Sequence, residues 1–235
     1  MHTSIMVFSS GFSDGTVLDK KTGEPIPRSF DPAASDKHRE LNLADLIFYD
    51  SEQKVSKFRV INPLNGMLEV DRSSLIIHVD GACRDNGRQV ARSSWGVFFG
   101  PGSPYNKCGI LPPNLPQTNS RAEIEAISQA LDIIQKIVVD AKDYTLQKIY
   151  ILSDSQYVVN ALTAWWARWM ENGGKTAAGQ QVAHLEKLKE IQRRIGQIGE
   201  ADGGMRQVKL WHIRRERNKE ADALANRALD EVRVI

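Results

Sequence analysis

The chain has 235 residues, of which 41% are hydrophobic and 26% are charged, and its formal net charge is +2. This composition is that of an ordinary globular protein and excludes collagen-like, disordered and membrane-embedded classes. No apolar run approaches the roughly 18 to 20 residues of a membrane-spanning helix, and the start lacks a secretory signal. We therefore expect an intracellular protein, nuclear or cytoplasmic, in which Cys83 and Cys108 are free thiols rather than a disulfide.

Residues 1–72 differ in character from the rest of the chain. They include the segment TGEPIPRSFDPAASD, whose Pro, Gly, Ser and Asp content predicts loop or linker. Two patches, at 43–50 and 57–70, have the character of strands or short helices. Residues 1–73 carry a net charge of −2 and the remaining residues a net charge of +4. The mildly basic second part is therefore compatible with a phosphate-rich partner. We expect a partly ordered extension of unknown role and partner at 1–72, followed by a main domain at 73–235.

The main domain alternates strand and helix signals. Apolar runs rich in β-branched residues predict strands at 75–83, 95–100, 106–111, 148–154 and 208–213. Apolar residues at helical spacing predict helices from a cap at Asn119 or Ser120, and at 154–170, 181–198 and 218–232. The order βββαβαβα with an extra helix predicts an α/β fold, a five-stranded mixed sheet with helices on both faces.

Four acidic residues fall where such a sheet brings distant segments together. Asp80 interrupts an apolar strand, where an unpaired charge is costly to bury. Asp154 ends another strand, and active sites of such sheets gather where parallel strands end. Glu123 lies in the first turn of one helix and Asp222 near the start of the last helix.

Each acid alone has a plain structural explanation. Asp80 with its following glycine suits a turn, Asp154 suits a helix cap, and the other two suit helix starts or solvent. Together they point to a metal site, because facing carboxylates repel unless a cation neutralises them. Oxygen ligands suit Mg²⁺ or Mn²⁺, and two such ions roughly 3.5–4 Å apart stabilise both the attacking and the leaving oxygen of a phosphodiester.

Residues from about 74 to 232 resemble the type 1 ribonuclease H domain of cellular organisms. The matching stretches stand in the family's order and are HVDGACRDNG (78–87), GPGSPYN (100–106), LPQTNSRAEIEA (115–126), ILSDSQYVVNAL (151–162), WWARWMENGGKTAAG (165–179) and NKEADALANRA (218–228). The resemblance implies the ribonuclease H-like fold over 73–235 and hydrolysis of the RNA strand of RNA–DNA hybrids. That cleavage would be endonucleolytic and would leave 5′-phosphate and 3′-hydroxyl ends.

The resemblance also implies which residues act. Asp80, Glu123, Asp154 and Asp222 would form the active site and hold two Mg²⁺ ions, with Mn²⁺ as a substitute. Short polar side chains beside that site would read the 2′-hydroxyl groups of RNA, and tryptophans with nearby cations would hold the DNA strand. The positions that match these substrate contacts are Asn86, Thr118, Asn119, Ser120, Trp165, Trp169, Lys175 and Thr176. At least one tryptophan of the WWARW stretch should belong to the core instead.

Two features depart from the family pattern. The family carries a histidine on a Gly-rich loop before the last helix, whereas this chain has the shorter WHIRRERNKEAD at 211–222. We interpret His212 as a strand residue, with a role in product release or proton handling as the alternative. Arg214, Arg215 or Arg217 would instead assist at the phosphate. Residues 1–72 show no basic aromatic module of the kind with which some eukaryotic relatives bind hybrids.

Two other functions remain open at this point. One is a catalytically silent nucleic-acid-binding domain of the same fold, against which the presence of all four acids speaks. The other is a transposase or resolvase, against which the QTNSRAE and WWARW stretches speak. We expect a monomer whose partner is an RNA–DNA hybrid, with no membrane contact, and the cleavage of a hybrid but not of duplex DNA would separate these functions.

Overall fold

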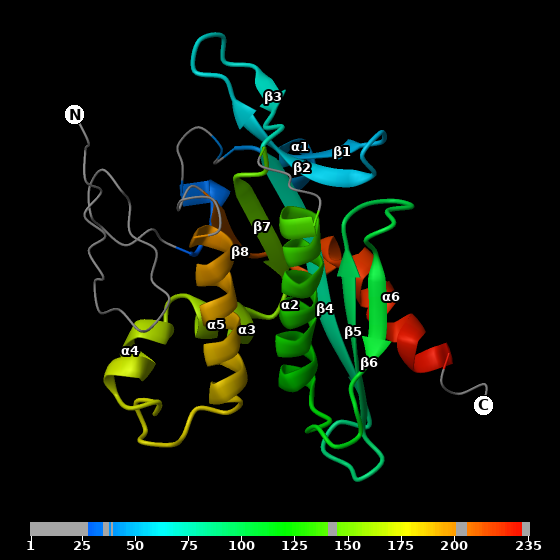
Figure 1. Ribbon diagram of the computed structural model, residues 1–235, viewed down its shortest axis with the longest axis vertical. Helices are drawn as coiled ribbons and strands as arrows, with labels where there is room; N and C mark the ends of the chain where they lie inside the picture. Colours follow the sequence, from blue (N-terminus) through cyan, green and yellow to red (C-terminus); the bar gives the residue numbers. More distant parts are fainter. Residues whose placement is uncertain (1–27, 35–37, 39, 141–144, 201–205, 232–235) are drawn as a thin grey trace.

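The computed structural model describes residues 28–34, 38, 40–140, 145–200 and 206–231. Within these ranges a mixed sheet carries helices on both faces, which confirms the predicted fold class (Figure 1). Across the described residues the sheet has eight strands rather than the expected five, because three strands of the N-terminal segment pair into it. No helix there combines the length and the apolar character needed to cross a membrane. The five strands predicted from the sequence are Ser74–Arg84 (β4), Arg92–Phe98 (β5), Lys107–Ile110 (β6), Lys148–Ser153 (β7) and Gln207–His212 (β8).

Strand β4 is the centre of the sheet. It pairs antiparallel with β5, which pairs antiparallel with β6, and it pairs in parallel with β7, which pairs in parallel with β8. In the β4–β7 register His78 is the partner of Leu152. The same register continued by two residues sets Asp80 beside Asp154, so both acids reach the same end of the parallel strands.

The helices differ from the expected ones mainly at their ends. The cap of the first long helix is Thr118, whose hydroxyl accepts a hydrogen bond from the Arg121 N–H at 3.2 Å, and not Asn119 or Ser120. The single helix expected at 154–170 is two helices, because Thr163 leaves helical geometry with φ −129° and ψ −92°. The helices of the main domain are Asn119–Gln135 (α2) with its continuation Lys136–Asp140 (η2), Gln156–Leu162 (α3), Trp166–Glu171 (α4), Leu185–Glu200 (α5), Arg215–Arg217 (η3) and Lys219–Glu231 (α6).

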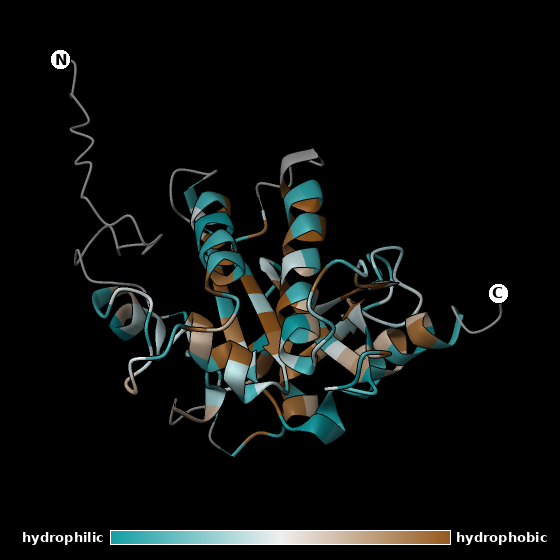
Figure 2. Cartoon of the chain, turned by 90° about the horizontal axis from the view of Figure 1, so that it is seen from below, coloured by the Kyte–Doolittle hydropathy of each residue, from teal (hydrophilic) through white to brown (hydrophobic). Residues whose placement is uncertain are grey.

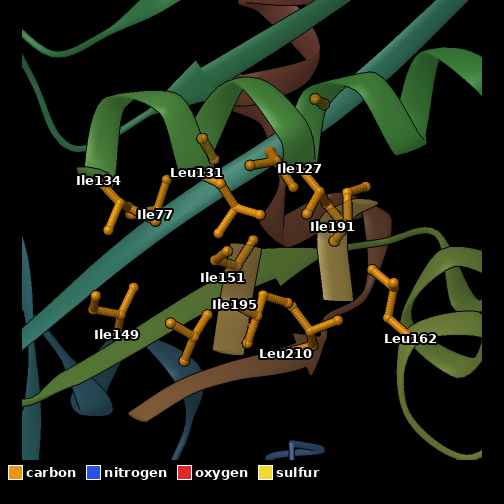
Figure 3. Packing of buried hydrophobic residues seen from close by; sticks show 14 of the residues in the cluster. Ile77, Ile127, Leu131, Ile134, Ile149, Ile151, Leu162, Ile191, Ile195 and Leu210 are labelled. Atoms are coloured by element: carbon orange, nitrogen blue, oxygen red, sulfur yellow. The ribbon is translucent and has the colours of Figure 1, made fainter. Parts of the chain in front are cut away.

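The main hydrophobic core lies between the sheet and helices α2, α3 and α5. Ile127 and Leu131 of α2 lie over Ile77 of β4 and Ile151 of β7, and Ile195 of α5 joins them (Figure 3). Helices α2 and α5 are each apolar along one side and polar along the other, and each therefore packs its apolar side against the sheet (Figure 2). Full burial of each such aliphatic side chain contributes roughly 1.5–3 kcal/mol, so this layer fixes where α2 sits on β4.

The opposite face carries α6, and the segment at 28–70 both extends the sheet and packs on this face. This segment contributes Pro32–Ala34 (η1), Leu43–Leu46 (α1), Ile47–Asp50 (β1), Val55–Ile61 (β2) and Leu68–Val70 (β3). Strand β2 joins the sheet through the pairing of Ser56 with Ile76 of β4. A second hydrophobic cluster forms where Leu46 and Phe58 meet Trp211 of β8. The patches expected to have strand or short-helix character are thus strands and a short helix packed on the main domain.

Residues 28–30 lie along β8. The Phe30 N–H donates to the Leu210 carbonyl oxygen at 2.8 Å, and the Leu210 N–H donates to the Arg28 carbonyl oxygen at 2.7 Å. Ser29 and Leu210 form a parallel bridge between these two bonds. The N-terminal segment therefore holds the sheet at β8 as well as at β4.

Candidate active site

The four acids come from four elements and line one pocket of about 170 Å³. Asp80 belongs to β4 and Asp154 directly follows β7, while Glu123 and Asp222 lie near the starts of α2 and α6. The structure thus brings together the four acids that the sequence places at one site. The remaining residues of the lining are Gly81, Ala82, Cys83, Arg84, Asn119, Arg215 and Asn226.

Two glycines let the two helices approach the sheet closely enough to form this pocket. A Cβ on Gly81 would stand 2.2 Å from the backbone nitrogen of Glu123, and one on Gly96 would stand 2.4 Å from the carbonyl oxygen of Ala221. Gly96 is the register partner of Asp80, so α6 crosses β5 next to this acid and carries Asp222 to it. Glycine at both positions therefore places Glu123 and Asp222 against Asp80.

Two of the acids in this pocket, Asp80 and Glu123, resist ionisation. Burial, together with the charges of Asp154 and Asp222, raises the pKa of Asp80 to about 8. Burial and the charges of Asp80 and Asp154 also raise the pKa of Glu123 well above its usual value, although the Gly81 N–H opposes both shifts. Such a site has an excess of negative charge that a bound cation would neutralise.

The donor set fits a hard divalent cation. Each of the four acids offers carboxylate oxygens, the ligands that Mg²⁺ and Mn²⁺ prefer. The Oε2 atom of Glu123 is buried and finds no hydrogen-bond partner among the described residues, and a cation would satisfy it. In the same ranges, no three acidic, histidine or cysteine side chains already surround one point in a way that would hold an ion. The chemistry of the pocket thus suits a divalent cation.

Cationic groups border the acids. Arg215 Nη2 lies 3.5 Å from Asp222 Oδ1, and of the three arginines at 214, 215 and 217 it is Arg215 that lines the pocket. Arg84 Nη2 forms an ion pair with Asp230 Oδ1 at 2.7 Å. His212 is the last residue of β8 and is exposed, as expected for a strand residue, and it is not part of the pocket lining.

The expected RNA contacts stand at different places around the pocket. Asn119 lines the pocket itself. Thr118 caps α2, and its Oγ1 atom lies 3.5 Å from the Oγ atom of Ser120, so both hydroxyls sit at the start of the helix that carries Glu123. Asn86 is exposed in the turn after β4, with its Oδ1 atom 3.7 Å from the Sγ atom of Cys83, which is a free thiol as expected.

The tryptophans divide into one exposed ring and two buried rings. Trp165 is 38% exposed, whereas Trp166 and Trp169 are 6% and 8% exposed and belong to the main core. The ring of Trp169 packs against that of Trp165 at a centroid distance of 5.5 Å, so Trp169 offers a substrate far less surface than Trp165 does, and its direct contact with substrate stays a prediction. Lys175 is exposed and Thr176 half-buried in the loop after α4, and the described pocket lining includes neither.

Three polar residues at the site were missed in the sequence. Arg84 and Asn226 line the pocket, and Asn218 hydrogen-bonds to Asp154 from just outside α6. An asparagine directly before a helix is a preferred cap, so the position of Asn218 carried a signal of local structure. The sequence carried no signal that Asn218 would contact Asp154, which lies 64 positions earlier in the chain.

Comparisons with known proteins find relatives that are named ribonuclease H. Ribonuclease H1 of Mus musculus is 38% identical over 118 residues, which are 50% of this chain and 38% of that protein. Ribonuclease H of Alcanivorax borkumensis is 31% identical over 160 residues, which are 68% of this chain and 94% of that protein. The crystal structure of RNase H1 from Halobacterium salinarum aligns at 27% identity and a TM-score of 0.42, covering 67% of this chain and 98% of that one. The chain thus spans well under half the length of its mammalian relatives.

The family match coincides with the part of the chain that builds the pocket. The sequence model of the family described as RNase H matches residues 72–230, which run from just before β4 to the last turn of α6. That stretch contains all four acids and the two glycines that bring them together. Because the family model matches more than half of the residues of this chain, the chain belongs to the RNase H family.

Proposed function

We propose that the chain is a metal-dependent endonuclease that hydrolyses the RNA strand of RNA–DNA hybrids and leaves 5′-phosphate and 3′-hydroxyl ends. The observation that carries this proposal is the pocket in which four carboxylates from four elements meet, two of them with raised pKa values. The reaction class is supported by relatives named ribonuclease H that this chain matches over most of their own length. The sequence resemblance supplies the hybrid as substrate.

Asp80, Glu123, Asp154 and Asp222 are the residues that would hold two Mg²⁺ ions, or Mn²⁺ in their place. Bound ions would supply the positive charge that a phosphodiester needs on its attacking and leaving oxygens. Without an ion, Asp80 retains its proton at neutral pH because its pKa is about 8. Ion binding should therefore release a proton from this carboxyl group, which makes metal affinity rise with pH.

Other residues of the chain would position the substrate. Asn119 in the pocket is the polar side chain best placed to hydrogen-bond a 2′-hydroxyl group, with Thr118, Ser120 and Asn86 nearby along the backbone of the hybrid. Arg215 would contact the scissile or adjacent phosphate, and Trp165 would stack on the DNA strand. In this proposal residues 73–235 form the catalytic domain, acting as a monomer.

The direct test is cleavage of a hybrid whose RNA strand carries an end label. The wild-type chain should cut that strand with Mg²⁺ and leave it intact with a chelator, and Asp154→Asn should remove nearly all cleavage. An all-DNA duplex of the same sequence serves as the matched substrate control and should resist cleavage. Equal cutting of both duplexes would favour a transposase-like enzyme. Hybrid binding without any cleavage in Mg²⁺ or Mn²⁺ would identify a silent binding domain.

A further inference from the structure

Asn218 connects three elements that carry the acids. Its side chain is fully buried, with an exposed fraction of 0%. The amide nitrogen Nδ2 donates to the carbonyl oxygen of Val79 at 2.9 Å and to Asp154 Oδ1 at 2.8 Å. Val79 directly precedes Asp80, so one amide group spans from β4 to the carboxylate that follows β7.

The backbone of Asn218 fixes the other side of the pocket. Its carbonyl oxygen accepts from the Asp222 N–H at 3.1 Å, which closes the first turn of α6. Its own N–H donates to the Arg215 carbonyl oxygen at 3.0 Å, which closes the short turn that brings Arg215 to the pocket. A single residue thus sets the relative positions of two acids and of the neighbouring arginine.

The chemistry of the side chain matches this task. A carboxamide nitrogen carries two hydrogens, and here each has its own acceptor. Aspartate at this position would offer no donor when ionised, and serine would offer one on a shorter arm. Because the negative charges of Asp154 and Asp80 repel each other, a donor that fixes Oδ1 keeps the Asp154 carboxylate in the pocket.

We propose that Asn218 is a positioning residue, which holds the carboxylate of Asp154 in the orientation that binds the divalent cation. It does not touch the substrate, and this role rests on the proposed function of the pocket. Replacing a residue that hydrogen-bonds to a metal ligand in this way lowers the metal affinity by about 10- to 100-fold.

The test compares Asn218→Ala with Asn106→Ala, a matched control. Asn106 also makes two side-chain hydrogen bonds, accepting from the Phe99 N–H and donating to the Gly100 carbonyl oxygen, each at 2.7 Å, and it is not part of the pocket lining. Both variants are measured by thermal unfolding, by titration of the free protein with Mn²⁺, and by kcat and KM on a labelled hybrid. Asn218→Ser is the second variant, because serine also suits a helix start and so protects the fold.

Both alanine variants should lose stability, but Asn218→Ala alone should weaken Mn²⁺ binding by about tenfold or more. Its kcat should fall while its KM for the hybrid stays near the wild-type value, and Asn218→Ser should lie between the two. Wild-type Mn²⁺ affinity in either folded Asn218 variant would overturn the positioning role. If the wild-type chain bound Mn²⁺ but cut no hybrid, weaker binding in Asn218→Ala would still support positioning, and the proposed function alone would fail.

Discussion

The backbone nitrogen of Glu123 lies 2.2 Å from the point at which a Cβ on Gly81 would stand. Gly81→Ala should therefore push the start of α2 away from β4, at a cost of about 1–3 kcal/mol, and reduce cleavage because Glu123 moves away from Asp80. Urea unfolding and a hybrid cleavage assay measure the two effects. Gly66→Ala is the control, since nothing in the described ranges lies within 4 Å of its Cβ and only its φ of +71° opposes the change.

Replacing Asp80 with asparagine should stabilise the metal-free protein while it removes cleavage. The pKa of Asp80 is about 8 in the folded chain against an ordinary value of 3.8, so folding takes up a proton between these pH values. The folded state then binds more protons than the unfolded state, and the stability of the wild type falls as the pH rises through this window.

Urea unfolding of the two proteins in a chelator at pH 5 and pH 8 checks this sign. The advantage of Asp80→Asn should grow toward pH 8 and reach at least about 1 kcal/mol there, since each unit of pKa shift corresponds to about 1.4 kcal/mol. An asparagine variant less stable than the wild type at pH 8 would show that the buried carboxylate is compensated by a partner.

Removal of the guanidinium at position 215 should slow the reaction. Arg215 lines the pocket and lies 3.5 Å from Asp222, whereas Arg214 faces solvent and lies 3.9 Å from Glu216. We expect Arg215→Ala to lower kcat/KM by about tenfold, or about 1.4 kcal/mol of activation free energy, and Arg214→Ala to behave like the wild type. Equal effects of both substitutions would indicate a general electrostatic contribution to hybrid binding instead.

The exposed Trp165 should contribute to hybrid affinity, and the buried Trp169 should contribute to the stability of the fold. Trp165→Ala should weaken hybrid binding by about 1–3 kcal/mol with little change in unfolding, because an exposed ring is free to stack on a base or sugar. Trp169→Ala should instead cost about 3–5 kcal/mol of stability, since this side chain is 8% exposed within the main core. Fluorescence anisotropy with a labelled hybrid and thermal unfolding distinguish the two outcomes, and the reverse pattern would refute the assignment.

The N-terminal segment should contribute strongly to the stability of the sheet. Phe58 of β2 is 3% exposed and meets Tyr150 of β7 at a ring-centroid distance of 5.0 Å. Phe58→Ala should lower the free energy of unfolding by about 3–5 kcal/mol, whereas Leu64→Ala, at a side chain 93% exposed on the same segment, should change it by less than about 0.5 kcal/mol. Matching small effects would mean that residues 28–70 unfold independently of the sheet.

The sequence predicted the strands and the meeting of the acids because both depend on local patterns. Apolar runs identify buried strands, and the parallel pairing of β4 with β7 then carries Asp80 to Asp154. The face of each tryptophan was not predictable, because the helix breaks at Thr163 and the helical spacing of α3 does not carry on into α4. The role of Asn218 was equally hidden, since its hydrogen bond to Val79 joins positions 139 residues apart.

The two backbone hydrogen bonds that join residues 28–30 to Leu210 also have a consequence for solubility. An outermost strand with bare amide and carbonyl groups is a template onto which another molecule can add a strand of its own. Here the chain occupies that template itself, although the match to its family begins only at residue 72. A fragment cut at that position would keep every acidic residue of the pocket and still expose this edge of the sheet, so it should self-associate more readily than the longer chain.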